Sequence, residues 1–129
     1  MLRFYPLLLL LLTLSACSPE RAASTNATTL YQHGSVTVQL SPAAAPVETP
    51  LKLTVIADGA SAVSGNITGV SMYMGRIPLR FSPAAGGFEA DFLLGACADP
   101  NMLWQLDIDI LDSDGKKHTV KQQFHSSWR

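Results

Sequence analysis

In the stretch "LWQLDIDIL", residues 103–111, apolar and polar side chains alternate from Trp104 to Ile110. Successive side chains of a β-strand point to opposite faces of the sheet, so a strand here buries one set of side chains and exposes the other. The set that we expect to face the core is Trp104, Leu106, Ile108 and Ile110, and the set that we expect to face solvent is Gln105, Asp107 and Asp109. The stretch therefore predicts a half-buried antiparallel strand.

The neighbouring segments extend this pattern into a sheet protein. "DSDG", residues 112–115, predicts a tight turn, and "KHTVKQQF", residues 117–124, predicts the hairpin partner of the first strand. The other segments expected to form strands are residues 35–40, 51–58, 67–75, 76–81 and 88–94, and those expected to form loops or turns are residues 41–50, 59–66 and 82–87. Because no segment shows sustained helical periodicity, we predict an all-β domain over residues 35–125. The predicted fold is an immunoglobulin-like antiparallel β-sandwich of about seven strands.

Composition and residue types argue against two broad functions. The chain has a net charge of −1 at pH 7 and no basic run, which disfavours a nucleic-acid partner. None of its three histidines, His33, His118 and His125, sits beside a serine in a nucleophile-elbow pattern. Asp107 and Asp109 are expected to be solvated charges on the outer face of a strand. We therefore expect that the protein is not an enzyme.

The beginning of the chain has the features of an export signal. Arg3 precedes an apolar run over residues 4–14, which is shorter than the roughly 20 residues that span a bilayer. The run ends in "LSAC", residues 14–17, which resembles the lipobox of bacterial lipoproteins. The resemblance implies a signal peptide over residues 1–16 and acylation of Cys17, including palmitate. Serine at position 18 implies sorting to the outer membrane, where the protein would face the periplasm.

Residues 17–34 are small and polar, and we expect them to form a flexible tether between the lipid and the domain. Cys17 and Cys97 are the two cysteines of the chain. If Cys17 is acylated, Cys97 cannot form an intramolecular disulfide. Two interpretations of Cys97 remain open: a buried, inert small side chain, or a thiolate ligand for a soft metal ion.

The methionines favour the metal interpretation. Met102 follows Cys97 by five positions, and Met72 and Met74 are expected to leave one face of strand 67–75 about 7 Å apart. Thiolate and thioether ligands select Cu(I). In the predicted topology the end of strand 67–75 meets the start of strand 103–111, so these sulfur atoms can converge. The alternative is that Met72 and Met74 only fill gaps in the core.

Two longer stretches carry a family resemblance: "GVSMYMGRIPLRF", residues 69–81, and "GGFEADFLLGACADPNMLWQLDIDI", residues 86–110. They resemble the FixH/YtkA-like group of small exported β-sandwich proteins. The resemblance implies a role in copper handling or oxidase assembly. The chain departs from FixH because it has a lipobox instead of a membrane helix, and it adds Cys97 to the turn.

The leading hypothesis is a periplasmic lipoprotein that binds Cu(I) for copper buffering, delivery or oxidase assembly and exchanges it with a protein partner. Cys97 and Met102 would form the site, with Met72 and Met74 as further ligands. The alternative is a structural or interaction lipoprotein of the envelope, without metal, that binds a protein partner through a sheet face or edge.

Overall fold

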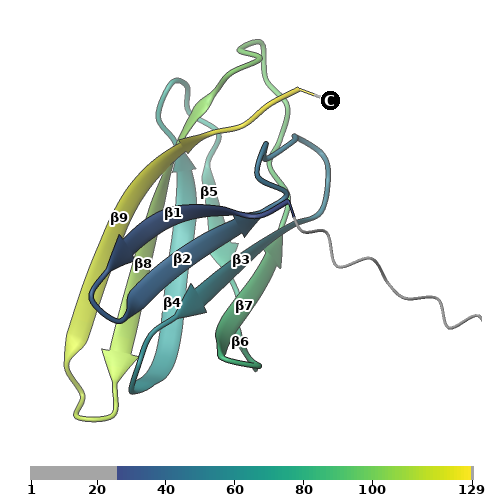
Figure 1. The fold of residues 1–129 in the computed structure, drawn as a ribbon. Helices are drawn as coiled ribbons and strands as arrows, with labels where there is room; N and C mark the ends of the chain where they lie inside the picture. Colours follow the sequence, from purple (N-terminus) through teal and green to yellow (C-terminus); the bar gives the residue numbers. More distant parts are fainter. Residues whose placement is uncertain (1–25, 129) are drawn as a thin grey trace, which may run out of the picture.

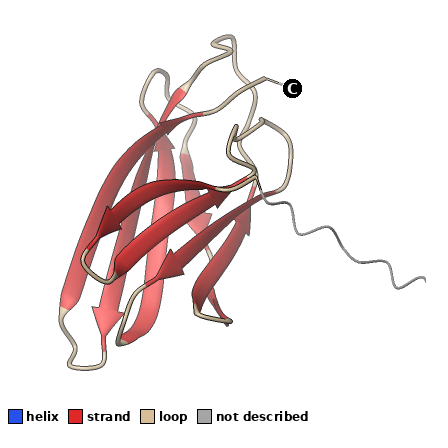
Figure 2. Cartoon of the chain, in the orientation of Figure 1, coloured by secondary structure: helices blue, strands red, loops and turns tan. Residues whose placement is uncertain are grey.

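The structure, a computed structural model, describes residues 26–128. The predicted signal peptide, Cys17 and the first part of the predicted tether lie outside the described residues. The described residues form two antiparallel sheets that pack face to face, with no helix (Figures 1 and 2). The predicted β-sandwich is therefore confirmed. Within this part of the chain, no helix has the length and apolar character needed to cross a membrane.

Nine strands build the two sheets, more than the seven or so predicted. In sheet order, the five-stranded sheet contains β1 (Thr28–His33), β2 (Val36–Ser41), β3 (Leu51–Ile56), β7 (Gly87–Phe92) and β6 (Ser82–Ala84). The four-stranded sheet contains β5 (Arg76–Leu79), β4 (Ala60–Gly69), β8 (Leu103–Asp112) and β9 (Lys117–His125).

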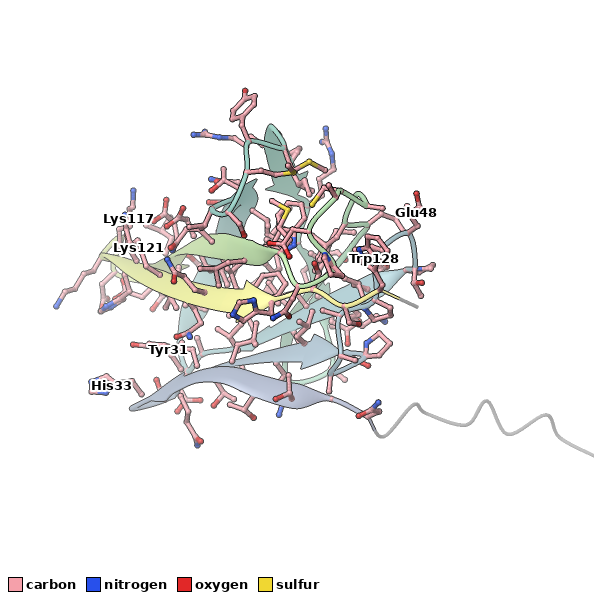
Figure 3. All side chains as sticks on the ribbon, turned by 90° about the horizontal axis from the view of Figure 1, so that it is seen from above. Tyr31, His33, Glu48, Lys117, Lys121 and Trp128 are labelled. Carbon is pink, nitrogen blue, oxygen red and sulfur yellow. The ribbon has the colours of Figure 1, made fainter. Side chains whose placement is uncertain are left out.

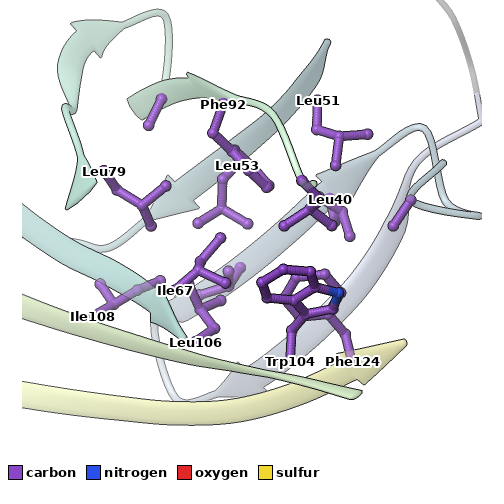
Figure 4. Packing of buried hydrophobic residues seen from close by; sticks show 14 of the residues in the cluster. Leu40, Leu51, Leu53, Ile67, Leu79, Phe92, Trp104, Leu106, Ile108 and Phe124 are labelled. Atoms are coloured by element: carbon purple, nitrogen blue, oxygen red, sulfur yellow. The ribbon is translucent and has the colours of Figure 1, made fainter. Parts of the chain in front are cut away.

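Strand β8 confirms the alternation on which the fold prediction was based. Its four predicted core residues are at most 2 % exposed, and they pack against apolar side chains of the other sheet, such as Leu40 and Leu53 (Figure 4). The largest of the four, Trp104, is fully buried, and its indole Nε1 donates a hydrogen bond of 2.9 Å to Oγ of Ser126. The polar N–H group of the largest core side chain thus has a hydrogen-bond partner inside the protein.

Strands β1 and β6 correct two of the predictions. The predicted tether of residues 17–34 is wrong over Thr28–His33, because these residues form β1 and pair with β2. The register of that pair shifts between Thr29 and Tyr31, and this irregularity breaks the alternation that would have revealed the strand. Likewise, part of the predicted turn over residues 82–87 forms the short strand β6.

Strand β4 corrects a third prediction. Residues 59–66 were expected to form a loop and residues 67–75 a strand, but β4 spans Ala60–Gly69 and the chain bends immediately after it. The strand contains few apolar residues, and Gly65 is required by close packing, because a Cβ there would lie 2.5 Å from the carbonyl oxygen of Asp107. The predicted common strand face of Met72 and Met74 is therefore wrong, since both follow β4 in a connecting loop.

Several connections gather at one end of the sandwich, which we call the loop end: residues 42–50, 70–75, 93–102 and 126–128 (Figure 1). Hydrogen bonds between backbone atoms join them. Ser126 N donates to Met102 O at 3.0 Å, and Val47 N donates to Ser127 O at 2.9 Å. Glu48 N donates to Leu94 O at 2.8 Å. The loop end is thus one connected structure, and it contains all of the described sulfur atoms.

Candidate metal centre

Cys97 and Met102 lie in direct contact on the loop between β7 and β8. The Cys97 Sγ is 3.3 Å from the Met102 Sδ, so the thiol donates a hydrogen bond to the thioether. The same Sγ lies 3.5 Å from the carbonyl oxygen of Asp99. The carboxylate of Asp99 in turn accepts a hydrogen bond of 2.9 Å from the backbone N–H of Asn101, which tightens the turn between the two sulfur residues.

The two sulfur residues differ in burial. Met102 is 1 % exposed and belongs to the core, and Ser126 fixes its backbone from the C-terminal side. Cys97 packs against the core but stays partly accessible. The pair therefore combines a fixed inner thioether with an outer thiol that solvent reaches.

Met74 is the third sulfur residue at this place. A Cβ added to Gly69 would lie 2.5 Å from Cε of Met102 and 3.4 Å from Cβ of Met74, so the two methionine side chains meet over this glycine. A Cβ added to Gly95 would lie 3.1 Å from Cε of Met74. Met74 therefore reaches from the end of β4 to the loop that carries Cys97, and the sulfur atoms drawn in Figure 3 gather in one region.

Met72 has a different position. It is 39 % exposed on the bend after β4, and its backbone carbonyl oxygen approaches Gly69. The structure thus brings together Cys97, Met102 and Met74, while Met72 is exposed on the loop that carries Met74.

The predicted pairing that allows this convergence is confirmed. Strand β4 runs antiparallel to β8, with Gly69 opposite Trp104, so the end of β4 meets the start of β8. Val70 N donates to Leu103 O at 2.9 Å, and Leu103 N donates to the Ser71 Oγ at 2.7 Å. These bonds hold the loop of Met74 beside the loop of Cys97. The position of Met74 thus follows from strand pairing, although its own segment is not a strand.

The histidines separate into two environments. His125 ends β9 beside the Cys97 loop, and its Nδ1 lies 3.0 Å from the carbonyl oxygen of Asn101. His33 and His118 lie at the opposite end of the sandwich, along an open pocket of about 250 Å³ that is also lined by Asp58 and Asp112. His118 Nε2 is 3.7 Å from Asp112 Oδ2. Even so, residues 26–128 contain no group of three or more His, Cys, Asp or Glu side chains arranged to hold a metal ion.

The carboxylates of β8 lie on the outer face of the four-stranded sheet, as expected. Asp109 accepts a hydrogen bond of 2.7 Å from the Thr119 hydroxyl and lies 3.2 Å from Lys117 Nζ. First the Thr119 hydrogen bond and then Lys117 lower the pKa of Asp109 below its usual value. Asp107 has one buried carboxylate oxygen, Oδ1, which lies 3.8 Å from Lys121 Nζ. These groups form a paired polar surface on the sheet.

Comparison with known proteins adds information on the fold alone. Neither a protein-family model nor a curated protein matches the chain. A solved structure, that of a DUF4426 family protein from Pseudomonas aeruginosa PAO1, has a TM-score of 0.50 and 13 % sequence identity. The similarity covers 81 % of this chain and 97 % of the other. At this identity the similarity is one of architecture.

Proposed function

We propose that the protein is a lipid-anchored lipoprotein of the bacterial envelope that binds Cu(I) through Cys97 and Met102, with Met74 as a third sulfur ligand. The observation that carries the proposal is the 3.3 Å separation of the Cys97 and Met102 sulfur atoms. Metal–thiolate bonds are about 2.3 Å long, so two sulfur atoms on one ion lie no more than about 4.6 Å apart. The pair is already within that limit.

The ligand types suit this ion. A thiolate and two thioethers form a soft, singly charged donor set, and such a set selects Cu(I) over harder ions. Binding would replace the proton of the Cys97 thiol with the metal ion, and that proton would pass to solvent. Met72, exposed on the same loop, would offer a further thioether to an ion that enters or leaves.

The cellular role follows from the site and the predicted anchor. Acyl chains on Cys17 would hold the protein in the membrane, with Ser18 directing it to the outer membrane and the domain facing the periplasm. A site with a partly accessible thiol permits exchange of the ion with another protein. We propose that the protein buffers or delivers copper and exchanges it with a partner protein. Delivery would include the supply of copper to an oxidase during its assembly.

The alternative is a metal-free interaction protein that uses a sheet face or edge. The burial of Met102 supports it, because a core methionine needs no further role. Strand addition at two of the sheet edges is disfavoured, since β5 and β6 are short and contain Pro78 and Pro83. The outer face of the four-stranded sheet carries paired charges on β8 and β9.

The test is a competition titration of the full-length lipoprotein in detergent against a coloured Cu(I) chelator under reducing conditions. We expect one Cu(I) per chain and a large loss of affinity in Cys97→Ser. A lost metal–ligand interaction of about 3 kcal/mol corresponds to roughly 100-fold in affinity. Thr68→Ala, a change on the outer face of β4, is the control and should leave the affinity unchanged. Affinity no higher than that of a scrambled methionine-containing peptide would overturn the proposal.

A further inference from the structure

The loop end carries most of the exposed apolar side chains. Of the seven large hydrophobic residues exposed in the described chain, five lie there: Val70, Met72, Tyr73, Leu93 and Trp128. Tyr73 is 93 % exposed at the tip of the loop between β4 and β5. Because a concentration of exposed apolar side chains is typical of an interaction surface, this end is the part of the described chain to examine for one.

These residues stand on a fixed scaffold. The loop of Val70 is bonded to Leu103, and the loop of Leu93 is bonded to the β2–β3 loop through Leu94 and Glu48. The β2–β3 loop is in turn bonded to the C-terminal residues, through Val47 N to Ser127 O and Ser127 N to Ala45 O. The apolar side chains are therefore presented together by one hydrogen-bonded structure.

The described chain also begins at this end. Asn26 O accepts a hydrogen bond of 2.7 Å from Ala43 N in the β2–β3 loop. The chain from Cys17 to Asn26 reaches at most about 32 Å, at 3.3–3.6 Å per residue. An acylated Cys17 therefore tethers the domain at the loop end, while the hairpin turns at the opposite end lie a further strand length from the anchor.

We propose that the loop end docks on the bilayer in which Cys17 is anchored, with Val70, Met72 and Tyr73 entering the interface between headgroups and acyl chains. The inference rests on the acylation of Cys17 in the proposed function. Tyrosine is enriched at this interface because its ring is apolar and its hydroxyl is polar. The loops add a second membrane signal to the acyl chains. Docking places Cys97 next to the lipid surface, so an exchange partner would meet it there.

The experiment measures tryptophan quenching in full-length lipoprotein reconstituted into phosphatidylcholine vesicles with brominated acyl chains. Two variants are compared, Tyr73→Trp and Leu111→Trp. Both also carry Trp128→Phe, so that the buried Trp104 is the one other tryptophan and contributes the same fluorescence to each. Leu111 is a matched control, because it is also exposed but lies at the opposite end of β8. We expect loss of fluorescence in Tyr73→Trp and no comparable loss in Leu111→Trp.

Equal quenching of the two variants would overturn the inference, and so would the absence of quenching in both. A chain that fails to join the vesicles would overturn it as well, because the anchor would then be missing. The measurement uses no copper, and Cys97→Ser should leave the quenching unchanged. A failure of docking is thus distinguishable from a failure of copper binding, which is measured in detergent.

Discussion

The Cys97 thiol donates a hydrogen bond to the Met102 thioether across 3.3 Å, although one side chain is partly exposed and the other is in the core. This contact joins an accessible reactive group to a fixed one. Met102 could serve only to pack the core, or it could also bind a metal ion. Packing depends on the shape of its side chain, whereas metal binding depends on its sulfur atom.

Met102→Leu tests that distinction directly. Leucine replaces methionine in a core at a cost of less than about 1.5 kcal/mol, since the volumes are similar. We expect a small change in the free energy of unfolding, measured by urea denaturation, together with a clear loss of Cu(I) affinity. A variant that keeps full affinity would exclude Met102 as a ligand.

Reactivity of Cys97 tests access to the site. The thiol is partly buried and hydrogen-bonded, so we expect a thiol reagent to label the native protein more slowly than the unfolded chain, but measurably. Bound Cu(I) should protect it. Labelling that requires unfolding would instead favour the metal-free interaction protein.

Gly69→Ala tests the packing that brings the methionines together. The added Cβ would meet Cε of Met102 and the carbonyl oxygen of Met72. Overpacking of this kind costs about 1–3 kcal/mol. We expect that loss in urea denaturation, with weaker Cu(I) binding because Met102 must move. The adjacent Thr68 faces outward, so Thr68→Ala should change the free energy of unfolding by less than about 0.5 kcal/mol. Equal effects of the two changes would contradict the packing described here.

Ser126→Ala tests the link between the core and the C-terminal residues. It leaves the buried indole N–H of Trp104 without its acceptor, which costs about 1–3 kcal/mol. Thermal unfolding should show a lower midpoint for this variant than for Ser127→Ala, whose backbone makes the bonds to the β2–β3 loop. Identical midpoints would mean that the indole hydrogen bond contributes nothing measurable.

Thr119→Val tests the electrostatics of the outer sheet face. The Thr119 hydroxyl is the main reason for the lowered pKa of Asp109, so the variant should raise that pKa toward its usual value. Because the pKa is lower in the folded chain, Asp109 stabilises the fold above the pKa of the unfolded chain, about 4, and this contribution is lost as the pH falls through the lower folded-state value. Carboxyl NMR titration gives the pKa, and an unchanged value would contradict the assignment.

The strands that the sequence predicts well are those that alternate over a buried face, such as β3, β8 and β9. Most of β4 was missed because the strand contains few apolar residues to signal it, and close packing requires glycine at position 65. β1 was missed because its register shifts within the pair with β2.

The candidate site was predictable in part for the same physical reasons. Cys97 and Met102 lie five positions apart around a turn, so their contact is local. Met74 reaches them through the antiparallel pairing of β4 and β8, which the sequence also predicts. The position of Met72 depends on where β4 ends. The sequence has no periodicity that marks the end of this strand, so the exposure of Met72 was not predictable.

The hydrogen bond from Ser126 to Met102 has a consequence for the order of events during folding. A chain is made from its N-terminus, and Ser126, which fixes the backbone of Met102, follows strand β9. The loop of Cys97 and Met102 therefore takes its final shape only after β9 has been made and has paired with β8. The contact between the two sulfur atoms is thus a late product of folding, although the two residues are near neighbours in the chain.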